Sequence, residues 1–177
     1  MQSLLENLVA DLRQEPELGA VASYIPELAQ VSPQHLAIAV ATADGGLFHA
    51  GDSRTPFSIQ SVSKVFTLAI ALGRVGDQLW TRVGREPSGN AFNSIVLLEN
   101  ENGRPRNPFI NAGALVTTDE ILAGRTPKLA LAEILGFVRV AAGDSEIHIN
   151  EAVAKSEITH GHKNVALAHF LKSFDIL

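Results

Sequence analysis

The chain has 177 residues, of which 46% are hydrophobic and 19% charged, with a net charge of −5 and a pI near 5.6. These values exclude a disordered chain and predict a single domain, residues 1–177, with a sizeable core. The net negative charge argues against binding to nucleic acid, and the sequence has no cluster of Lys and Arg that would indicate binding to a membrane surface. The absence of cysteine excludes disulfides, a thiolate nucleophile and a Cys-ligated metal.

The N-terminal residues predict a helix rather than a targeting segment. Apolar residues recur at helical spacing over the first dozen positions, which is typical of an amphipathic helix. They are Leu4, Leu5, Leu8, Val9 and Leu12. Neither a basic leader nor a long apolar run precedes or follows them, so we expect no signal peptide, no transmembrane helix and a cytoplasmic location.

A β-hairpin follows a looped segment that contains Tyr24, the sole tyrosine. In residues 35–42, small and β-branched side chains alternate and place Leu36, Ile38 and Val40 on one face. A turn at residues 44–46 and a returning run complete the pattern. A lone hairpin leaves open edges, so we expect the sheet to be incomplete.

The rest of the chain predicts helices and one long loop. Residues 61–72 indicate a buried helix stopped by Gly73, and residues 84–113 indicate an ordered functional loop. Later helices are expected over residues 126–140, after an N-cap at Asn150, and over residues 164–173.

Ser61 and Lys64 form a Ser-x-x-Lys motif at the start of the first of these helices. This spacing places both side chains on one helix face, one turn apart. A lysine buried among Val62, Val65 and the apolar residues that follow loses hydration, so its pKa falls and its neutral amine is able to take the proton of Ser61. The amide N–H of Ser61 is a candidate for one half of an oxyanion hole.

The tetrapeptide alone is a weak signal, because Ser and Lys meet at this spacing by chance. In the alternative interpretation, Ser58 or Ser61 caps the helix and Lys64 extends to solvent. The setting favours the functional interpretation: Lys64 is a lone charge in an apolar helix, and polar Gln60 and Ser61 precede it.

Four ordered segments resemble the glutaminase family. They are GAVASYIPEL at residues 19–28, FSIQSVSK at 57–64, VGREPSGNAFNS at 83–94 and NPFINAGA at 107–114. The resemblance extends from Gly19 to the end of the chain. It implies an α+β fold, namely the N-terminal portion of a serine β-lactamase/DD-peptidase-like fold with an incomplete antiparallel sheet.

The resemblance also implies an activity, the hydrolysis of L-glutamine to L-glutamate and ammonia without a cofactor or metal. It makes Ser61 the nucleophile and Lys64 its base. It implies that the substrate is bound by Tyr24, Gln60, Ser61, Asn111, Glu157 and Asn164. The chemistry agrees, since the ammonium group of glutamine requires a carboxylate such as Glu157, and its carboxylate requires neutral donors such as Asn111, Asn164 and the Tyr24 hydroxyl.

Some of these residues also have structural interpretations. Asn107, which precedes a proline, is expected to form a turn. Glu157 taken alone is a solvated helix charge, and Asn164 is a cap of the last helix. The two histidines at positions 160 and 162 lack Cys or carboxylate partners at ligand spacing, so we expect no metal there.

Members of the glutaminase family extend beyond the point that corresponds to Leu177. Their later portion carries two further active-site tyrosines, the second oxyanion-hole amide and the remaining strands. We therefore expect a glutaminase domain that is truncated at its C-terminus, with little or no activity in isolation, from a parent family of homo-oligomers. Two alternatives remain: a non-catalytic fragment that associates with a homologue, and a penicillin-recognising acylase whose second motif Ser88-Gly89-Asn90 resembles.

Overall fold

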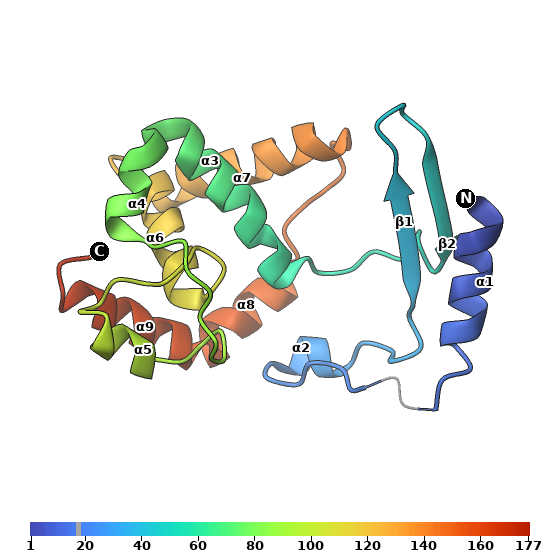
Figure 1. The fold of residues 1–177 in the computed structure, drawn as a ribbon, viewed down its shortest axis with the longest axis horizontal. Helices are drawn as coiled ribbons and strands as arrows, with labels where there is room; N and C mark the ends of the chain where they lie inside the picture. Colours follow the sequence, from blue (N-terminus) through green and yellow to red (C-terminus); the bar gives the residue numbers. More distant parts are fainter. Residues whose placement is uncertain (17–18) are drawn as a thin grey trace. The chain divides into compact units, whose positions relative to one another are not determined.

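The computed structural model describes residues 1–16 and 19–177, which form two compact units. The first unit comprises Met1–Ser58 and Lys155–His160, and the second comprises Ile59–Ala154 and Gly161–Leu177. Figure 1 shows the elements of both units in chain order.

The first unit is built on the predicted hairpin. Strands β1 (Ala37–Ala41) and β2 (Leu47–Gly51) pair antiparallel, from Ala37 opposite Gly51 to Ala41 opposite Leu47. Gly45 turns the chain with a φ of 88°, a conformation that favours glycine. In the described part of the chain, these two strands make up the whole sheet, which agrees with the predicted incomplete sheet.

Helix α1 (Gln2–Leu12) packs on one face of this hairpin (Figure 1). Its buried residues Leu5 and Val9 contact Ala50 and a partly buried layer made of Leu36, Ile38, Val40 and Phe48. The predicted inward face of β1 is therefore confirmed. The predicted helix face is only partly right, because Leu4, Leu8 and Leu12 remain exposed.

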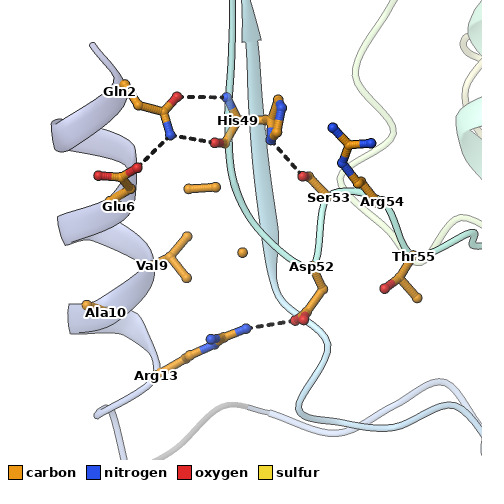
Figure 2. A pocket seen from close by; sticks show the side chains of 12 residues that line it. Gln2, Glu6, Val9, Ala10, Arg13, His49, Asp52, Ser53, Arg54 and Thr55 are labelled. Carbon is orange, nitrogen blue, oxygen red and sulfur yellow. Dashed lines mark hydrogen bonds and ion pairs between the residues drawn. The ribbon is translucent and has the colours of Figure 1, made fainter.

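Polar contacts fix α1 to β2 at both ends of the helix (Figure 2). The Gln2 side chain donates to the carbonyl of His49 at 2.9 Å and accepts from its amide at 3.4 Å. At the other end, Arg13 forms an ion pair with Asp52 at 2.8 Å. Between these contacts lies an open cavity of about 430 Å³. The first unit also contains the short helix α2 (Pro26–Ala29), which the sequence analysis did not predict.

The second unit is helical. Its helices are α3 (Ser63–Val75), α4 (Leu79–Arg82), α5 (Val96–Asn100), α6 (Asn111–Leu122), α7 (Pro127–Ala142) and α9 (His162–Lys172), with 3₁₀ turns at Gln60–Val62 and Gly76–Gln78. Helix α8 (Glu151–His160) contributes its first four residues to this unit. Helix α6 packs against α3, α7 and α9, so it is the central helix of the second unit.

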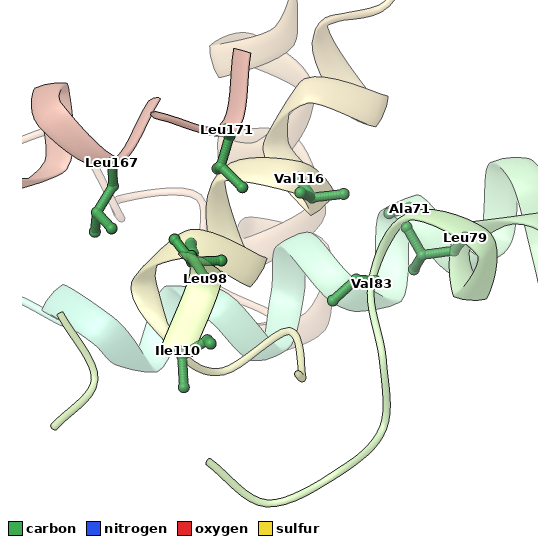
Figure 3. Packing of buried hydrophobic residues seen from close by; sticks show 9 residues of the cluster. Ala71, Leu79, Val83, Leu98, Ile110, Val116, Leu167 and Leu171 are labelled. Atoms are coloured by element: carbon green, nitrogen blue, oxygen red, sulfur yellow. The ribbon is translucent and has the colours of Figure 1, made fainter. Parts of the chain in front are cut away.

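A buried apolar cluster joins these helices (Figure 3). Leu79 of α4, Val116 of α6 and Leu171 of α9 are fully buried in it. Figure 3 shows Leu98 and Ile110 in the same cluster, so the segment between α4 and α6 is anchored to the core at two points.

Several helix boundaries confirm the sequence predictions. Helix α7 starts at the Thr126 cap, whose hydroxyl accepts from the Leu129 amide, and the Asn150 side chain accepts from the Val153 amide at 3.1 Å before α8. The predicted stop at Gly73 is wrong, because α3 continues to Val75 and ends at Gly76, whose φ is 54°. A glycine inside a helix only lowers its stability, whereas a positive φ ends it.

Helix α6 was missed by the sequence analysis, which assigned its first residues to the 84–113 loop. Its buried residues are small or β-branched and occupy one half of the helix: Ala112, Gly113, Val116, Thr117 and Ile121. The partly buried Leu115 and Leu122 lie on the other half, so apolar residues surround the helix axis. A helix that packs on several sides lacks the amphipathic period that identifies a surface helix.

None of the helices in the described part of the chain combines the length and the apolar character that a membrane span requires.

Candidate active site

Lys64 lies in the first turn of α3 and is buried, with 9% of its surface exposed. Its ammonium group donates to the Phe109 carbonyl at 3.0 Å and to Asn111 Oδ1 at 2.7 Å, and it lies 5.7 Å from the centre of the Phe92 ring. Burial lowers the pKa of Lys64, because it disfavours the charged form. The alternative in which Lys64 extends to solvent is therefore wrong.

The surroundings of Lys64 differ in part from those expected. Val62 and Val65 are more than half exposed, whereas Phe66 and Leu68 of the same helix are partly buried. The ammonium group itself contacts residues 92, 109 and 111, which belong to the long 84–113 segment.

Ser61 lies in the 3₁₀ turn that precedes α3, and its side chain is exposed. The N-cap positions are Ile59 for this turn and Val62 for α3, so Ser61 lies inside the turn and is the N-cap of neither element. Among the described residues, no hydrogen bond joins Ser61 to Lys64. Hydrogen bonds between catalytic groups are often long before substrate binds and shorten in the complex.

Gln60, directly before Ser61, has a φ of 42°. The left-handed region costs a non-glycine residue about 1–2 kcal/mol. Such outliers cluster at functional sites, where the surrounding structure holds the strain. The sharp turn at Gln60 sets the direction in which the chain enters the Ser61 turn.

A chain of amide contacts extends from Lys64 to α9. Because the N–H groups of Lys64 donate to it, the oxygen of Asn111 faces the amine, and the Asn111 amide is left to donate to Asn164 Oδ1 at 2.9 Å. This arrangement leaves the amide of Asn164 as the terminal donor. Asn164 does not cap α9, since the helix begins at His162 after Gly161 without a side-chain cap bond. The structure thus brings together three of the predicted residues, Lys64, Asn111 and Asn164.

Tyr24 and Glu157 meet within the first unit. The Tyr24 hydroxyl donates to Glu157 Oε1 at 2.7 Å, so Glu157 is more than a solvated helix charge. Partial burial, this hydrogen bond and the negative charge of Glu157 raise the pKa of Tyr24 to about 12. The hydroxyl proton is directed at Glu157, whereas the sequence analysis expected it to serve a substrate carboxylate.

The Phe109 carbonyl was not among the predicted partners of Lys64, because a main-chain acceptor leaves no trace in side-chain identity. The predicted turn at Asn107 is confirmed: Asn107 Oδ1 accepts from the amides of Phe109 at 3.0 Å and Ile110 at 3.2 Å. The Ser88-Gly89-Asn90 segment also forms a local turn, in which the Ser88 hydroxyl donates to the Asn90 carbonyl.

Comparison with known proteins gives a consistent result. A sequence model of the family described as Glutaminase matches residues 19–177. A glutaminase of Rhodopseudomonas palustris is 60% identical over 98% of this chain and 57% of its own length. A glutaminase of Psychrobacter cryohalolentis is 56% identical over 98% of this chain and 57% of its own length. The chain therefore spans about 57% of the length of these relatives.

Solved structures agree with the sequence matches. A probable glutaminase of Bacillus subtilis superposes with a TM-score of 0.86 and 34% identity over 99% of this chain and 54% of its own. A crystal structure of Mglu in its glutamate form gives a TM-score of 0.91 and 35% identity over 100% of this chain and 40% of its own. The predicted fold class is confirmed: the chain has the N-terminal portion of the serine β-lactamase-like fold of these enzymes. Four sequence motifs, the match of the family model to residues 19–177 and the superposition on solved glutaminases agree, so the chain belongs to the glutaminase family.

Proposed function

We propose that this chain carries the nucleophile and the base of an enzyme that hydrolyses L-glutamine to L-glutamate and ammonia. The observation that carries the proposal is the state of Lys64: buried, shifted to a lower pKa, and three residues after an exposed serine. Membership of the glutaminase family supports the same activity.

The two partners of Lys64 suit a base. A neutral amine has two N–H groups and one lone pair. The Phe109 carbonyl and Asn111 Oδ1 accept one N–H each, which leaves the lone pair for the Ser61 proton. The protonated amine then has a third N–H to return to the leaving group.

The reaction follows as two acyl transfers. Ser61 Oγ attacks the side-chain carbonyl carbon of glutamine while its proton moves to Lys64. The C–N bond then breaks, and the nitrogen leaves as ammonia with the proton returned by Lys64. Water attacks the resulting ester, again with Lys64 as base, and releases glutamate and the free Ser61 hydroxyl.

The chemistry of Glu157 and Asn164 suits the two ends of a free amino acid. We assign the ammonium group to Glu157, held in orientation by Tyr24, and the carboxylate to amide donors such as Asn164. Gln60 shapes the turn that presents Ser61. The structure of Mglu in its glutamate form, a related enzyme with the product bound, supports glutamine as the substrate.

Three sequence predictions remain predictions: a cytoplasmic location, self-association of the parent enzyme and low activity of these 177 residues alone. Because of the last of these, the decisive experiment measures acylation rather than turnover. The protein is incubated with an activated γ-ester of glutamate, which needs little help with its leaving group, and its peptides are mapped by mass spectrometry.

We expect a glutamyl group on the Ser61 peptide, with no acylation in Ser61→Ala and slower acylation in Lys64→Met. Exposed Ser173, which is not part of the proposed machinery, supplies a matched control variant, Ser173→Ala, which keeps the wild-type rate. Equal labelling of the wild type and Ser61→Ala would refute the assignment of the nucleophile. Ammonia release from glutamine, measured in parallel, tests the low activity expected of the isolated chain.

A further inference from the structure

Both hydrogen-bond acceptors of Lys64 belong to one short segment, residues 107–111. Phe109 contributes its main-chain carbonyl, and Asn111, the first residue of α6, contributes its side chain. The position of the Lys64 amine therefore depends on what fixes this segment.

Both the oxygen and the amide group of the Asn107 side chain hold residues 107–111 in place. The oxygen accepts from the amides of Phe109 and Ile110, which sets the turn that directs the Phe109 carbonyl to Lys64. The side-chain amide donates to the Glu86 carbonyl at 2.8 Å. Since Asn107 does not contact Lys64, any effect it has on the amine passes through the turn.

Gly113, in α6, has no side chain, which allows residues 107 and 108 to pack directly against this helix. A Cβ at this glycine would lie 1.9 Å from the Asn107 carbonyl oxygen and 2.9 Å from Pro108 Cα. Real Cβ atoms do not approach backbone this closely, so an alanine forces the segment away from the helix. Gly73 in α3 and Gly136 in α7 have open space at the same place and carry no such constraint.

A second strip of backbone supports the segment from outside. The Gly84 amide donates to the Pro105 carbonyl at 2.7 Å, and the Glu86 amide donates to the Arg106 carbonyl at 2.9 Å. Together with the Asn107–Glu86 bond, these contacts join residues 84–86 to residues 105–107.

We propose that Asn107 and Gly113 form a positioning element that holds the Phe109 carbonyl and the Asn111 side chain on Lys64, and so keeps the Lys64 amine in place for proton transfer with Ser61. The role in proton transfer rests on the proposed function, but the positioning itself is measurable without turnover. Asn107 is a positioning residue here, since its side chain holds the turn through Glu86, Phe109 and Ile110 and acts on Lys64 only through that turn.

The test is the pH-dependent acetylation of individual lysines by acetic anhydride, followed by mass spectrometry, with exposed Lys128 and Lys163 as internal standards. In the wild type, Lys64 reacts slowly because it is buried. In Asn107→Ala, two amides lose their acceptor, so we expect Lys64 to react about tenfold faster, as the loss of one or two hydrogen bonds implies. The pH midpoint of its labelling should also rise towards the ordinary value of a lysine.

Three further variants make the result specific. Gly113→Ala should repeat the effect, while Gly73→Ala, a glycine to alanine change within α3 itself, should leave the labelling of Lys64 unchanged. Asn107→Asp keeps the acceptor for both amides and loses only the bond to Glu86, so it should fall between wild type and Asn107→Ala and also serves if Asn107→Ala fails to fold.

The proposal is overturned if the acetylation rate and the pH midpoint of Lys64 are unchanged in both folded Gly113→Ala and Asn107→Ala. If Asn107→Ala does not fold, Asn107→Asp takes its place in this comparison. The two proposals fail separately. A responsive Lys64 without acylation of Ser61 removes the proposed function and leaves the positioning, whereas normal acylation with an unresponsive Lys64 removes only the positioning.

Discussion

The layer formed by α1 and the hairpin is stabilised differently from the segment that leads into α6. In the first, apolar side chains at regular spacing meet across two surfaces, and the polar contacts lie at the ends of α1. In the second, residues 84–111 are held by backbone pairing, by the Asn107 side chain and by close approach at glycines. A periodic pattern therefore builds a layer, whereas the surroundings of a buried amine depend on a few individual contacts.

The first prediction compares a buried leucine of the second unit with an exposed leucine of the first, and its effect is the largest. Leu79 is fully buried in the helical cluster, so Leu79→Ala should lower the free energy of unfolding by about 2–5 kcal/mol. Leu47, on β2, is 70% exposed, so Leu47→Ala should change it by less than about 0.5 kcal/mol. Urea unfolding followed by circular dichroism measures both, and similar losses in the two variants would contradict the assignment of the core.

The next largest effect compares two arginines. Arg82 is 26% exposed and contacts Asp119, Glu120 and the Ile176 carbonyl, so Arg82→Gln should cost about 1–3 kcal/mol because it leaves partly buried acceptors without a donor. Arg13 is 48% exposed and has one ion pair, with Asp52, so Arg13→Gln should cost at most about 1 kcal/mol.

The same unfolding assay at low and high salt sharpens this comparison. The effect of Arg13→Gln should shrink at high salt, because exposed charges are screened, and the effect of Arg82→Gln should persist. Equal costs with equal salt dependence would show that burial does not separate the two arginines.

The smallest effect is spectroscopic. Tyr24 is the only tyrosine, so ultraviolet absorbance reports its ionisation directly, and we expect a midpoint near pH 12. Glu157→Gln removes the negative charge but keeps an acceptor, so the pKa of Tyr24 should fall towards 10.0 without reaching it, because the partial burial remains. The same midpoint in both proteins would contradict the contact with Glu157.

The sign of the corresponding stability effect follows from the raised pKa. The folded state favours the neutral phenol, so the contribution is fully present below pH 10, the ordinary pKa of tyrosine, and is lost as pH rises towards 12. Circular dichroism recorded along the titration distinguishes this loss from global unfolding.

Short-range patterns in the sequence predicted the hairpin, α1 and the capped starts of α7 and α8. Each depends on a short-range rule: alternation in residues 35–42, helical spacing in the first dozen residues, and side-chain caps at Thr126 and Asn150. The four family motifs added the expected partners of Ser61 before any contact was known.

The contacts that bury Lys64 could not be predicted from short-range patterns. Its acceptors come from residues 45 and 47 positions later in the chain, and one of them is a backbone carbonyl, which no residue type encodes. Helix α6 escaped prediction for a related reason, since contacts with α3, α7 and α9 replace the single apolar face that periodicity detects. Local patterns fix elements, but the environment of a buried amine is a property of chain segments that meet only in the folded protein.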